Sequence, residues 1–282
     1  MGANPTDPEH ARLVKAGKPA LDDRPFVILK VPAGFITPTR RARLQSPAMK
    51  ARRKNILGVI FDVDGVLCDS EPFIRAAAVQ MFQRLHGCTV TPEDFLPFTG
   101  AGEDRFLGGV AEKYGVHLVH PRDKDLTYAL YLEEIKGRLQ PLSGAPAFIA
   151  DCRRQGLKLA VATSADRIKL VGNLAQIGLP AAGFDAVVTG SDVTRKKPDP
   201  EVFLKAAAGL NLEPGHCLVV EDAPHGLEAG RAAGAWCLGL TTSFAAADLR
   251  RAGADWTGPD LARVPEEVRR RLRGRSGARA DI

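Results

Sequence analysis

Short apolar runs alternate with amphipathic stretches between residue 55 and about residue 240. The runs are rich in aliphatic and β-branched residues, as in buried strands, and they cover residues 56–61, 157–162, 186–188, 217–220 and 236–240. Between the later runs, apolar residues recur at helical spacing in residues 145–154, 167–177, 200–210 and 226–233. Buried strands separated by helices predict an α/β fold, a doubly wound parallel sheet with helices on both faces.

The first two predicted strands are about ninety-five residues apart, far more than a crossover connection requires. Helical patterns fill most of this segment, in residues 73–85, 103–114 and 123–138. We therefore expect a small all-helical cap, residues 72–142, inserted after the first strand. The core then consists of residues 55–71 and 143–260, and both connections to the cap lie above the C-terminal end of the first strand.

The flanking segments have a different composition from the predicted core. Residues 1–54 contain several prolines and little periodicity, and we interpret them as an irregular basic extension. Residues 261–282 are interpreted as a basic C-terminal tail. Seven cations and no acid lie in residues 40–54, and six cations and no acid lie in residues 269–279. Without these cations the net charge of +6 becomes −7, so the high pI does not indicate a nucleic-acid-binding domain. The flanks are either solvated tails or arms that bind an anionic partner.

The cysteines and the hydropathy limit the cellular setting. The five cysteines form no C-x-x-C pair, which favours reduced thiols in an intracellular protein. No apolar run approaches the roughly 20 residues that a membrane-spanning helix needs, and no secretory signal precedes the first strand. We expect a soluble cytoplasmic monomer, or a plastid protein if the source is photosynthetic.

Acidic residues follow the first predicted strand in the stretch V-I-F-D-V-D-G-V-L-C-D-S-E, residues 59–71. Asp62 and Asp64 are two residues apart, so their side chains point to the same side of an extended chain. In open α/β sheets, ligands bind beyond the carboxyl ends of the strands. Two close carboxylates repel each other unless a cation lies between them or one of them is protonated. Mg²⁺, which prefers oxygen ligands, would remove this repulsion.

Polar residues also follow three later elements of the pattern. Thr163 and Ser164 come after the second strand, at an expected helix start, where an anion is favoured. Lys197 precedes a proline that opens a helix, and Glu221 and Asp222 follow the fourth strand as a second acidic pair. Taken singly, these residues are ordinary: a helix cap, a surface lysine or acids in a turn. Together they indicate one polar site at the carboxyl edge of the sheet.

In this order and placement, the four motifs resemble the haloacid dehalogenase-like hydrolase superfamily, over residues 56–242. The most similar subgroup has a Rossmann-like core and a helical cap after the first strand, and it includes β-phosphoglucomutases, phosphoglycolate phosphatases and CbbY-type phosphatases. Residues 98–111 and 161–169 resemble more narrowly the hydrolase domain of a plant chloroplast protein.

The resemblance implies a role for each matching residue. Asp62 is the expected nucleophile, which forms an aspartyl-phosphate intermediate. Asp64 is the expected general acid and base, which protonates the leaving oxygen and then activates water. Thr163, the amide of Ser164, and Lys197 are expected to hold the phosphoryl oxygens.

A Mg²⁺ ion is the cofactor that the resemblance implies. Its expected ligands are the carboxylates of Asp62 and Asp222 and the backbone carbonyl of Asp64. Glu221 is expected to bind the ion through water or to support the other ligands.

Two reactions remain open within this subgroup. β-Phosphoglucomutases carry a histidine and an arginine at positions that align with Ile74 and Glu103 here, and neither residue can replace them. The absence of these two groups favours hydrolysis over phosphoryl transfer to a second sugar position, although Arg105 could supply charge from another angle. Dehalogenation is disfavoured because a halide needs no acid such as Asp64 to leave. A non-catalytic binding module is the third alternative.

The substrate contacts are expected in and near the cap. The candidates are Ser70, Glu103, Arg105 and Arg167. We expect a small phosphorylated metabolite, such as a sugar phosphate, a sugar acid phosphate or phosphoglycolate, and neither a specific nucleic acid nor a membrane as partner.

Overall fold

The computed structural model describes residues 55–100 and 102–272. The expectations for residues 1–54, and for the tail beyond residue 272, lie outside the described residues. Within the described ranges, no helix is both long and apolar enough to cross a membrane.

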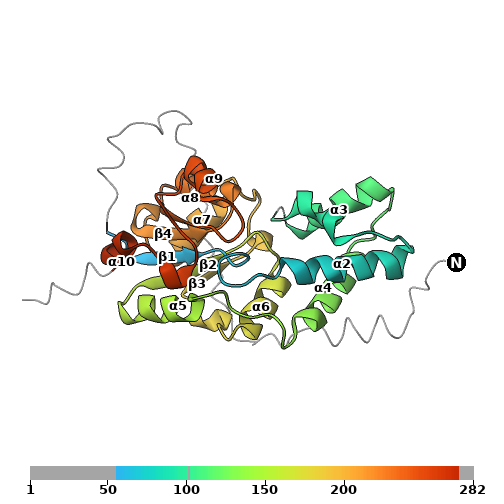
Figure 1. The fold of residues 1–282 in the computed structure, drawn as a ribbon, viewed down its shortest axis with the longest axis horizontal. Coiled ribbons are helices and arrows are strands. Elements are labelled where there is room, and N and C mark those ends of the chain that lie inside the picture. Colours follow the sequence, from blue (N-terminus) through green and yellow to red (C-terminus); the bar gives the residue numbers. More distant parts are fainter. Residues whose placement is uncertain (1–54, 101, 273–282) are drawn as a thin grey trace, which may run out of the picture.

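A six-stranded parallel sheet forms the core, in the order β3-β2-β1-β4-β5-β6 (Figure 1). The strands are β1 (Gly58–Phe61), β2 (Lys158–Ala162), β3 (Ala186–Val188), β4 (Cys217–Glu221), β5 (Trp236–Leu240) and β6 (Trp256–Gly258). The predicted α/β class is confirmed, and β6 is an additional strand that the sequence pattern did not indicate. Because β1 lies between β2 and β4, the carboxyl ends of these three strands are neighbours.

Helices cover both faces of the sheet. One face packs against α5 (Ala145–Arg154), α6 (Arg167–Gln176) and α10 (Glu266–Leu272), and the other against α7 (Glu201–Gly209), α8 (Pro224–Ala233) and α9 (Ala246–Ala252). The residues of β1 alternate between the two layers, since Val59 and Phe61 pack with the first set and Ile60 with the second. Short 3-10 turns occur at Ala181–Gly183, Gly190–Asp192, Pro214–His216 and Leu261–Arg263.

The segment between β1 and β2 is helical, as expected for the cap. It contains α2 (Glu71–His86), the 3-10 helix η2 (Pro92–Phe98), α3 (Glu103–Tyr114) and α4 (Arg122–Ile135). These elements lie beside the sheet domain, with α2 and α4 close together (Figure 1). Aromatic rings form part of the interior of the cap: the ring centres of Phe82 and Phe95 are 6.1 Å apart, and those of Phe95 and Phe106 are 4.7 Å apart.

The predicted boundary of the C-terminal tail is wrong for residues 261–272. This segment forms a 3-10 turn and α10, and it packs on the core through Leu261, Val268 and Leu272, all of which are buried. Val268 and Leu272 are four residues apart and therefore share one side of a helix. The neighbouring arginines occupy the rest of the helix, so the charge of the segment concealed an amphipathic pattern.

Candidate active site

Asp62 lies at the carboxyl end of the central strand β1. Its backbone amide donates to the carbonyl of Val220 at 3.0 Å, which continues the pairing of β1 with β4 by one residue. This register places Asp62 beside Glu221, the last residue of β4. The Nζ of Lys197 lies between them, 2.5 Å from Asp62 Oδ1 and 2.7 Å from Glu221 Oε1. Three residues from three separate parts of the chain thus form one buried charged cluster.

Asp62, Glu221 and Asp222 bring their carboxylates together. All three side chains are buried, and each offers an oxygen within 4.8 Å of the others. Burial raises the pKa of Asp62 to about 7, against the opposing effect of Lys197. Burial, and then the charges of Glu221 and Asp62, raise the pKa of Asp222 well above its usual range. The crowding of negative charge around these oxygens fits a hard divalent cation such as Mg²⁺.

The two acids of the β4 motif make different contacts. Glu221 Oε1 accepts from Lys197, and its Oε2 accepts from the amides of Asp222 at 2.9 Å and Ala223 at 3.0 Å. Asp222 instead accepts a hydrogen bond from the hydroxyl of Ser243, a residue that the sequence analysis did not single out. Both oxygens of Glu221 are therefore engaged by the protein, which suits a supporting role. Asp62 and Asp222 are the carboxylates better placed to bind an ion directly.

Gly65 allows this packing. Its φ of 73° lies in the left-handed region, and a Cβ at this position would lie 1.9 Å from Asp222 Oδ2. A glycine is therefore needed at position 65 both for its backbone conformation and for the space that Asp222 occupies. It lets the loop after β1 approach the acidic pair of β4.

Asp64 lies at the margin of this cluster and is held through both oxygens. The hydroxyl of Ser70 donates to Oδ1, and the Nζ of Lys169 donates to Oδ2 at 3.0 Å. Ser70 is fully buried. We predicted Ser70 as a substrate contact; in the structure its hydroxyl binds Asp64.

Thr163 and Ser164 lie in the loop after β2, before α6 begins. The helix starts at Arg167, as predicted, with Asp166 as its N-cap, so Thr163 and Ser164 lie in the loop a few residues before the helix start and not at it. The amide of Thr163 donates to the carbonyl of Val188 at 3.0 Å, and its hydroxyl accepts from the amide of Ala165 at 3.1 Å. The loop is therefore fixed by its own hydrogen bonds beside the ends of β1 and β2. The hydroxyl of Thr163 keeps its proton available for an anion.

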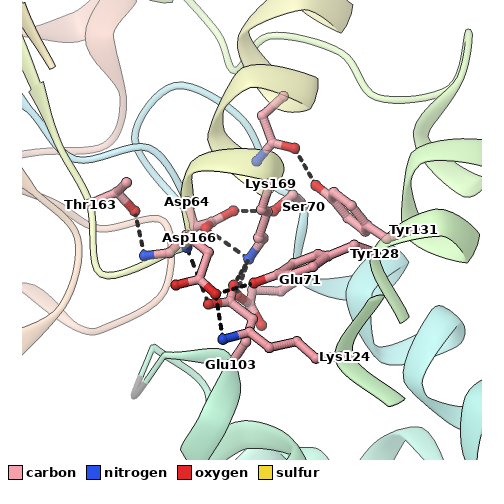
Figure 2. A network of polar contacts seen from close by, with 12 residues as sticks. Asp64, Ser70, Glu71, Glu103, Lys124, Tyr128, Tyr131, Thr163, Asp166 and Lys169 are labelled. Atoms are coloured by element: carbon pink, nitrogen blue, oxygen red, sulfur yellow. Dashed lines mark hydrogen bonds and ion pairs between the residues drawn. The ribbon is translucent and has the colours of Figure 1, made fainter. Parts of the chain in front are cut away.

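A network of polar contacts that the sequence analysis missed joins the core to the cap (Figure 2). Lys169 of α6 is only 3% exposed, and its Nζ lies 3.0 Å from Asp64 Oδ2, 3.3 Å from Glu71 Oε1 and 3.9 Å from Glu103 Oε1. Burial lowers the pKa of Lys169, but the carboxylates of Asp64 and Glu71, and then Glu103, raise it well above its usual range. Lys169 therefore stays protonated.

Asp166 forms the other half of this network. Its Oδ2 accepts from the Tyr128 hydroxyl at 2.8 Å and lies 2.5 Å from the Nζ of Lys124, both residues of the cap helix α4. The amide of Asp166 donates to Glu103 Oε2 at 3.3 Å. Asp166 and Lys169 lie within residues 161–169, a stretch noted for its resemblance, but nothing in the sequence showed that these two residues join the site.

Arg105 and Arg167 were predicted as substrate contacts, but each lies against an acidic side chain of the protein. Arg105 is half exposed, bonds Glu112 at 2.9 Å and lies over the ring of Phe98. Arg167 lies 3.7 Å from Asp192. Glu103, the remaining candidate, is buried beside Lys169 and Asp166.

The core is a parallel α/β sheet with acidic pairs after two adjacent strands and a buried lysine between them, and a helical cap lies beside it. This combination is typical of one class of α/β hydrolases. The family model for haloacid dehalogenase-like hydrolases matches residues 56–234, so the chain belongs to this family.

Similar proteins place the chain among phosphatase-like members of the family. Suppressor of quenching 1, a chloroplastic protein of Arabidopsis thaliana, is 39% identical over 74% of this chain, a match that spans 20% of the plant protein. Validoxylamine A 7'-phosphate phosphatase of Streptomyces hygroscopicus is 32% identical over 68% of this chain and 89% of that enzyme. The structure of CbbY from Rhodobacter sphaeroides in complex with phosphate is 26% identical and covers 73% of this chain and 95% of that one, with a TM-score of 0.63. The predicted family and narrower resemblance are confirmed.

Proposed function

We propose that the protein is a Mg²⁺-dependent phosphomonoester hydrolase that acts on a small phosphorylated metabolite, a sugar phosphate or a phosphoglycolate-like compound. The observation that carries the proposal is the cluster at the ends of β1 and β4, where Lys197 bridges Asp62 and Glu221 beside Asp222. One cation among three buried carboxylates leaves an excess of negative charge, which a divalent ion would neutralise. The ion and Lys197 together would then offer positive charge to a phosphoryl group.

In this proposal, Asp62 attacks phosphorus and forms a covalent aspartyl-phosphate. Asp64, held by Ser70 and Lys169, protonates the leaving alkoxide and then takes a proton from the water that attacks the intermediate. Lys197 and the loop of Thr163 and Ser164 bind the phosphoryl oxygens.

The side chains of Asp62 and Asp222 and the backbone carbonyl of Asp64 would hold Mg²⁺. When bound, the ion supplies positive charge that stabilises the developing charge on the phosphoryl group.

Hydrolysis is favoured over phosphomutase action by the contents of two cap positions. Ile74, which aligns with a mutase histidine, is buried in the apolar interior. Glu103, which aligns with a mutase arginine, faces Lys169, and Arg105 bonds Glu112. These positions therefore offer no cation for a second phosphate, so water has better access to the aspartyl-phosphate.

The test is turnover of a panel of phosphomonoesters with Mg²⁺, including β-glucose 1-phosphate with a trace of the 1,6-bisphosphate. We expect release of inorganic phosphate, no turnover in excess EDTA, and loss of turnover in Asp62→Asn because the amide cannot act as nucleophile. Asp69→Asn is the matched control, since Asp69 lies on the same loop with an exposed side chain.

The other possible outcomes identify a different function or refute one of the assigned roles. Glucose 6-phosphate without phosphate release would identify a mutase, and no turnover of any ester would identify a binding module. Turnover by Asp62→Asn would refute the nucleophile, and turnover in EDTA would refute the ion.

A further inference from the structure

We propose that Lys169 is a positioning residue that holds Asp64 for proton transfer and makes this hold depend on the cap. The inference rests on the proposed function, in which Asp64 is the general acid and base. It adds a residue of α6 that none of the four sequence motifs contains, and it assigns a task to the polar network of Figure 2.

The contacts of Lys169 join the core to the cap. Its side chain rises from α6 of the core and reaches Asp64 at 3.0 Å on the loop after β1. The same Nζ reaches Glu71 at 3.3 Å, at the start of α2, and Glu103 at 3.9 Å, at the start of α3. One ammonium group therefore binds the proposed acid and base together with the first residues of two cap helices.

The chemistry of the ammonium group explains why these contacts are coupled. A buried charge is costly unless it is paired, and breaking a buried pair leaves the remaining charge uncompensated. Asp64, Glu71 and Glu103 would repel one another without Lys169. The position of the lysine therefore depends on all three carboxylates, and the position of each carboxylate depends on the lysine. If α3 moved away with the cap, Glu103 would leave this cluster and the balance of charge at Asp64 would change.

The contacts of Asp64 leave its carboxylate oxygens able to give and take a proton. Ser70 occupies one lone pair of Oδ1 and Lys169 one lone pair of Oδ2, and each carboxylate oxygen has another. The two contacts therefore fix the plane of the carboxylate without blocking proton transfer. A misplaced catalytic group costs about 100-fold in rate even for a shift of about 1 Å.

The experiment compares Lys169→Met, Lys169→Gln and Lys169→Arg with the unaltered full chain. The control is Lys158→Met, because Lys158 donates to the carbonyl of Leu210 at the opposite, amino end of the strands. The readouts are kcat and KM for the best ester of the panel, the Kd of inorganic phosphate, and hydrogen–deuterium exchange of α3 and of the sheet.

We expect Lys169→Met and Lys169→Gln to lower kcat by about 100-fold. KM and the phosphate Kd should stay within about threefold, because Thr163 and Lys197 are untouched. Lys169→Arg should recover part of kcat because it keeps the charge. Exchange should become faster at the start of α3 and stay unchanged in β1, β2 and β4. Lys158→Met should change none of these readouts.

Three results would overturn the inference. An unchanged kcat in Lys169→Met and Lys169→Gln would show that Asp64 needs no such support. Equal losses of kcat, phosphate binding and exchange protection of the sheet would show a purely structural role; Lys169→Gln decides this if Lys169→Met does not fold. If the unaltered chain hydrolyses no ester, the proposed function fails by itself, and unchanged exchange of α3 in the variants would then overturn the coupling to the cap.

Discussion

The surroundings of Asp62 oppose the negative charge of its carboxylate. Burial raises the pKa of its carboxyl to about 7, while the unfolded chain loses the same proton near the usual value of 3.8. The folded metal-free protein therefore holds this proton over the window from about pH 4 to pH 7, and the unfolded chain does not. The free energy of unfolding of the metal-free protein consequently falls as the pH rises through this window.

This proton predicts the pH dependence of Mg²⁺ binding. The proposed ion would bind the ionised carboxylate, so protonation of Asp62 would compete with it. Below pH 7 we expect the apparent affinity for Mg²⁺ to fall by at least about tenfold for each pH unit, because the pKa of Asp222 is raised as well. Titration calorimetry at pH 6, 7 and 8, in buffers of different ionisation enthalpy, measures both the affinity and the proton release. An affinity that does not change with pH would contradict the arrangement, and Asp69→Asn should behave as the unaltered chain does.

Single residues also show where the sequence was informative. Asp62, Lys197, Glu221 and Asp222 were predicted because each follows a strand or opens a helix, and strand order brings such positions together. Lys169 could not be found in this way, since it lies within α6 and does not directly follow a strand. The sequence does not distinguish a buried lysine from an exposed one, and the burial of Lys169 follows only from the way the cap lies against α6.

At the scale of elements, one aspartate joins the two long helices of the cap. Asp123 is fully buried in the first turn of α4. Its carboxylate accepts from the amide of Val119 at 2.8 Å, from Arg122 at 2.7 Å and from His86 at 2.8 Å. Because His86 ends α2, the carboxylate ties the start of one helix to the end of the other.

Asp123→Asn should destabilise the cap by about 1–3 kcal/mol at pH 7, because the amide leaves one of these donors without an acceptor. Burial alone would raise the pKa of Asp123, but the hydrogen bonds from Val119, Arg122 and His86 outweigh burial and lower it. The stabilisation is therefore present above about pH 4 and is lost as the pH falls below it. Urea unfolding at pH 7 and pH 3 measures the difference.

The exposed Asp125 provides the control for this prediction, since it lies in the same turn of α4. Asp125→Asn should leave the unfolding midpoint unchanged. Equal effects of the two substitutions, or an effect of Asp123→Asn that is as large at pH 3 as at pH 7, would show that the carboxylate of Asp123 is not the link.

Elements with a clear apolar run or period were predicted well, down to the three-residue strand β3, whereas β6 and α10 were not predicted. Helix α3 has its predicted bounds, Glu103–Tyr114, and strand β5 has its predicted bounds, Trp236–Leu240. Strand β6 has the sequence Trp-Thr-Gly, which is too short to show a period and is not an apolar run like that of β3, and it pairs with the edge of β5. Helix α10 was missed because its arginines dominated the composition of the segment.

At the scale of the whole molecule, α10 extends the folded unit beyond the expected boundary. Val268 is fully buried in the same cluster as β5 and α5. Val268→Ala should lower the free energy of unfolding by about 1–3 kcal/mol, from lost burial and the cavity left behind. Arg270→Ala is the control, since Arg270 is exposed on the same helix. Thermal unfolding measures both, and an unchanged midpoint for Val268→Ala would mean that α10 does not support the core.

The position of β1 in the middle of the sheet has a consequence for synthesis. The ribosome makes this strand before the other strands of the sheet. Its two neighbours, β2 and β4, begin only at residues 158 and 217. Until β2 is made both edges of this apolar strand stay unpaired, and until β4 is made one edge stays unpaired, the condition that favours aggregation of nascent chains. A truncated chain released before Cys217 should consequently depend on chaperones to stay dispersed. No phosphate chemistry should be measurable until Lys197, Glu221 and Asp222, the partners of Asp62, have been made.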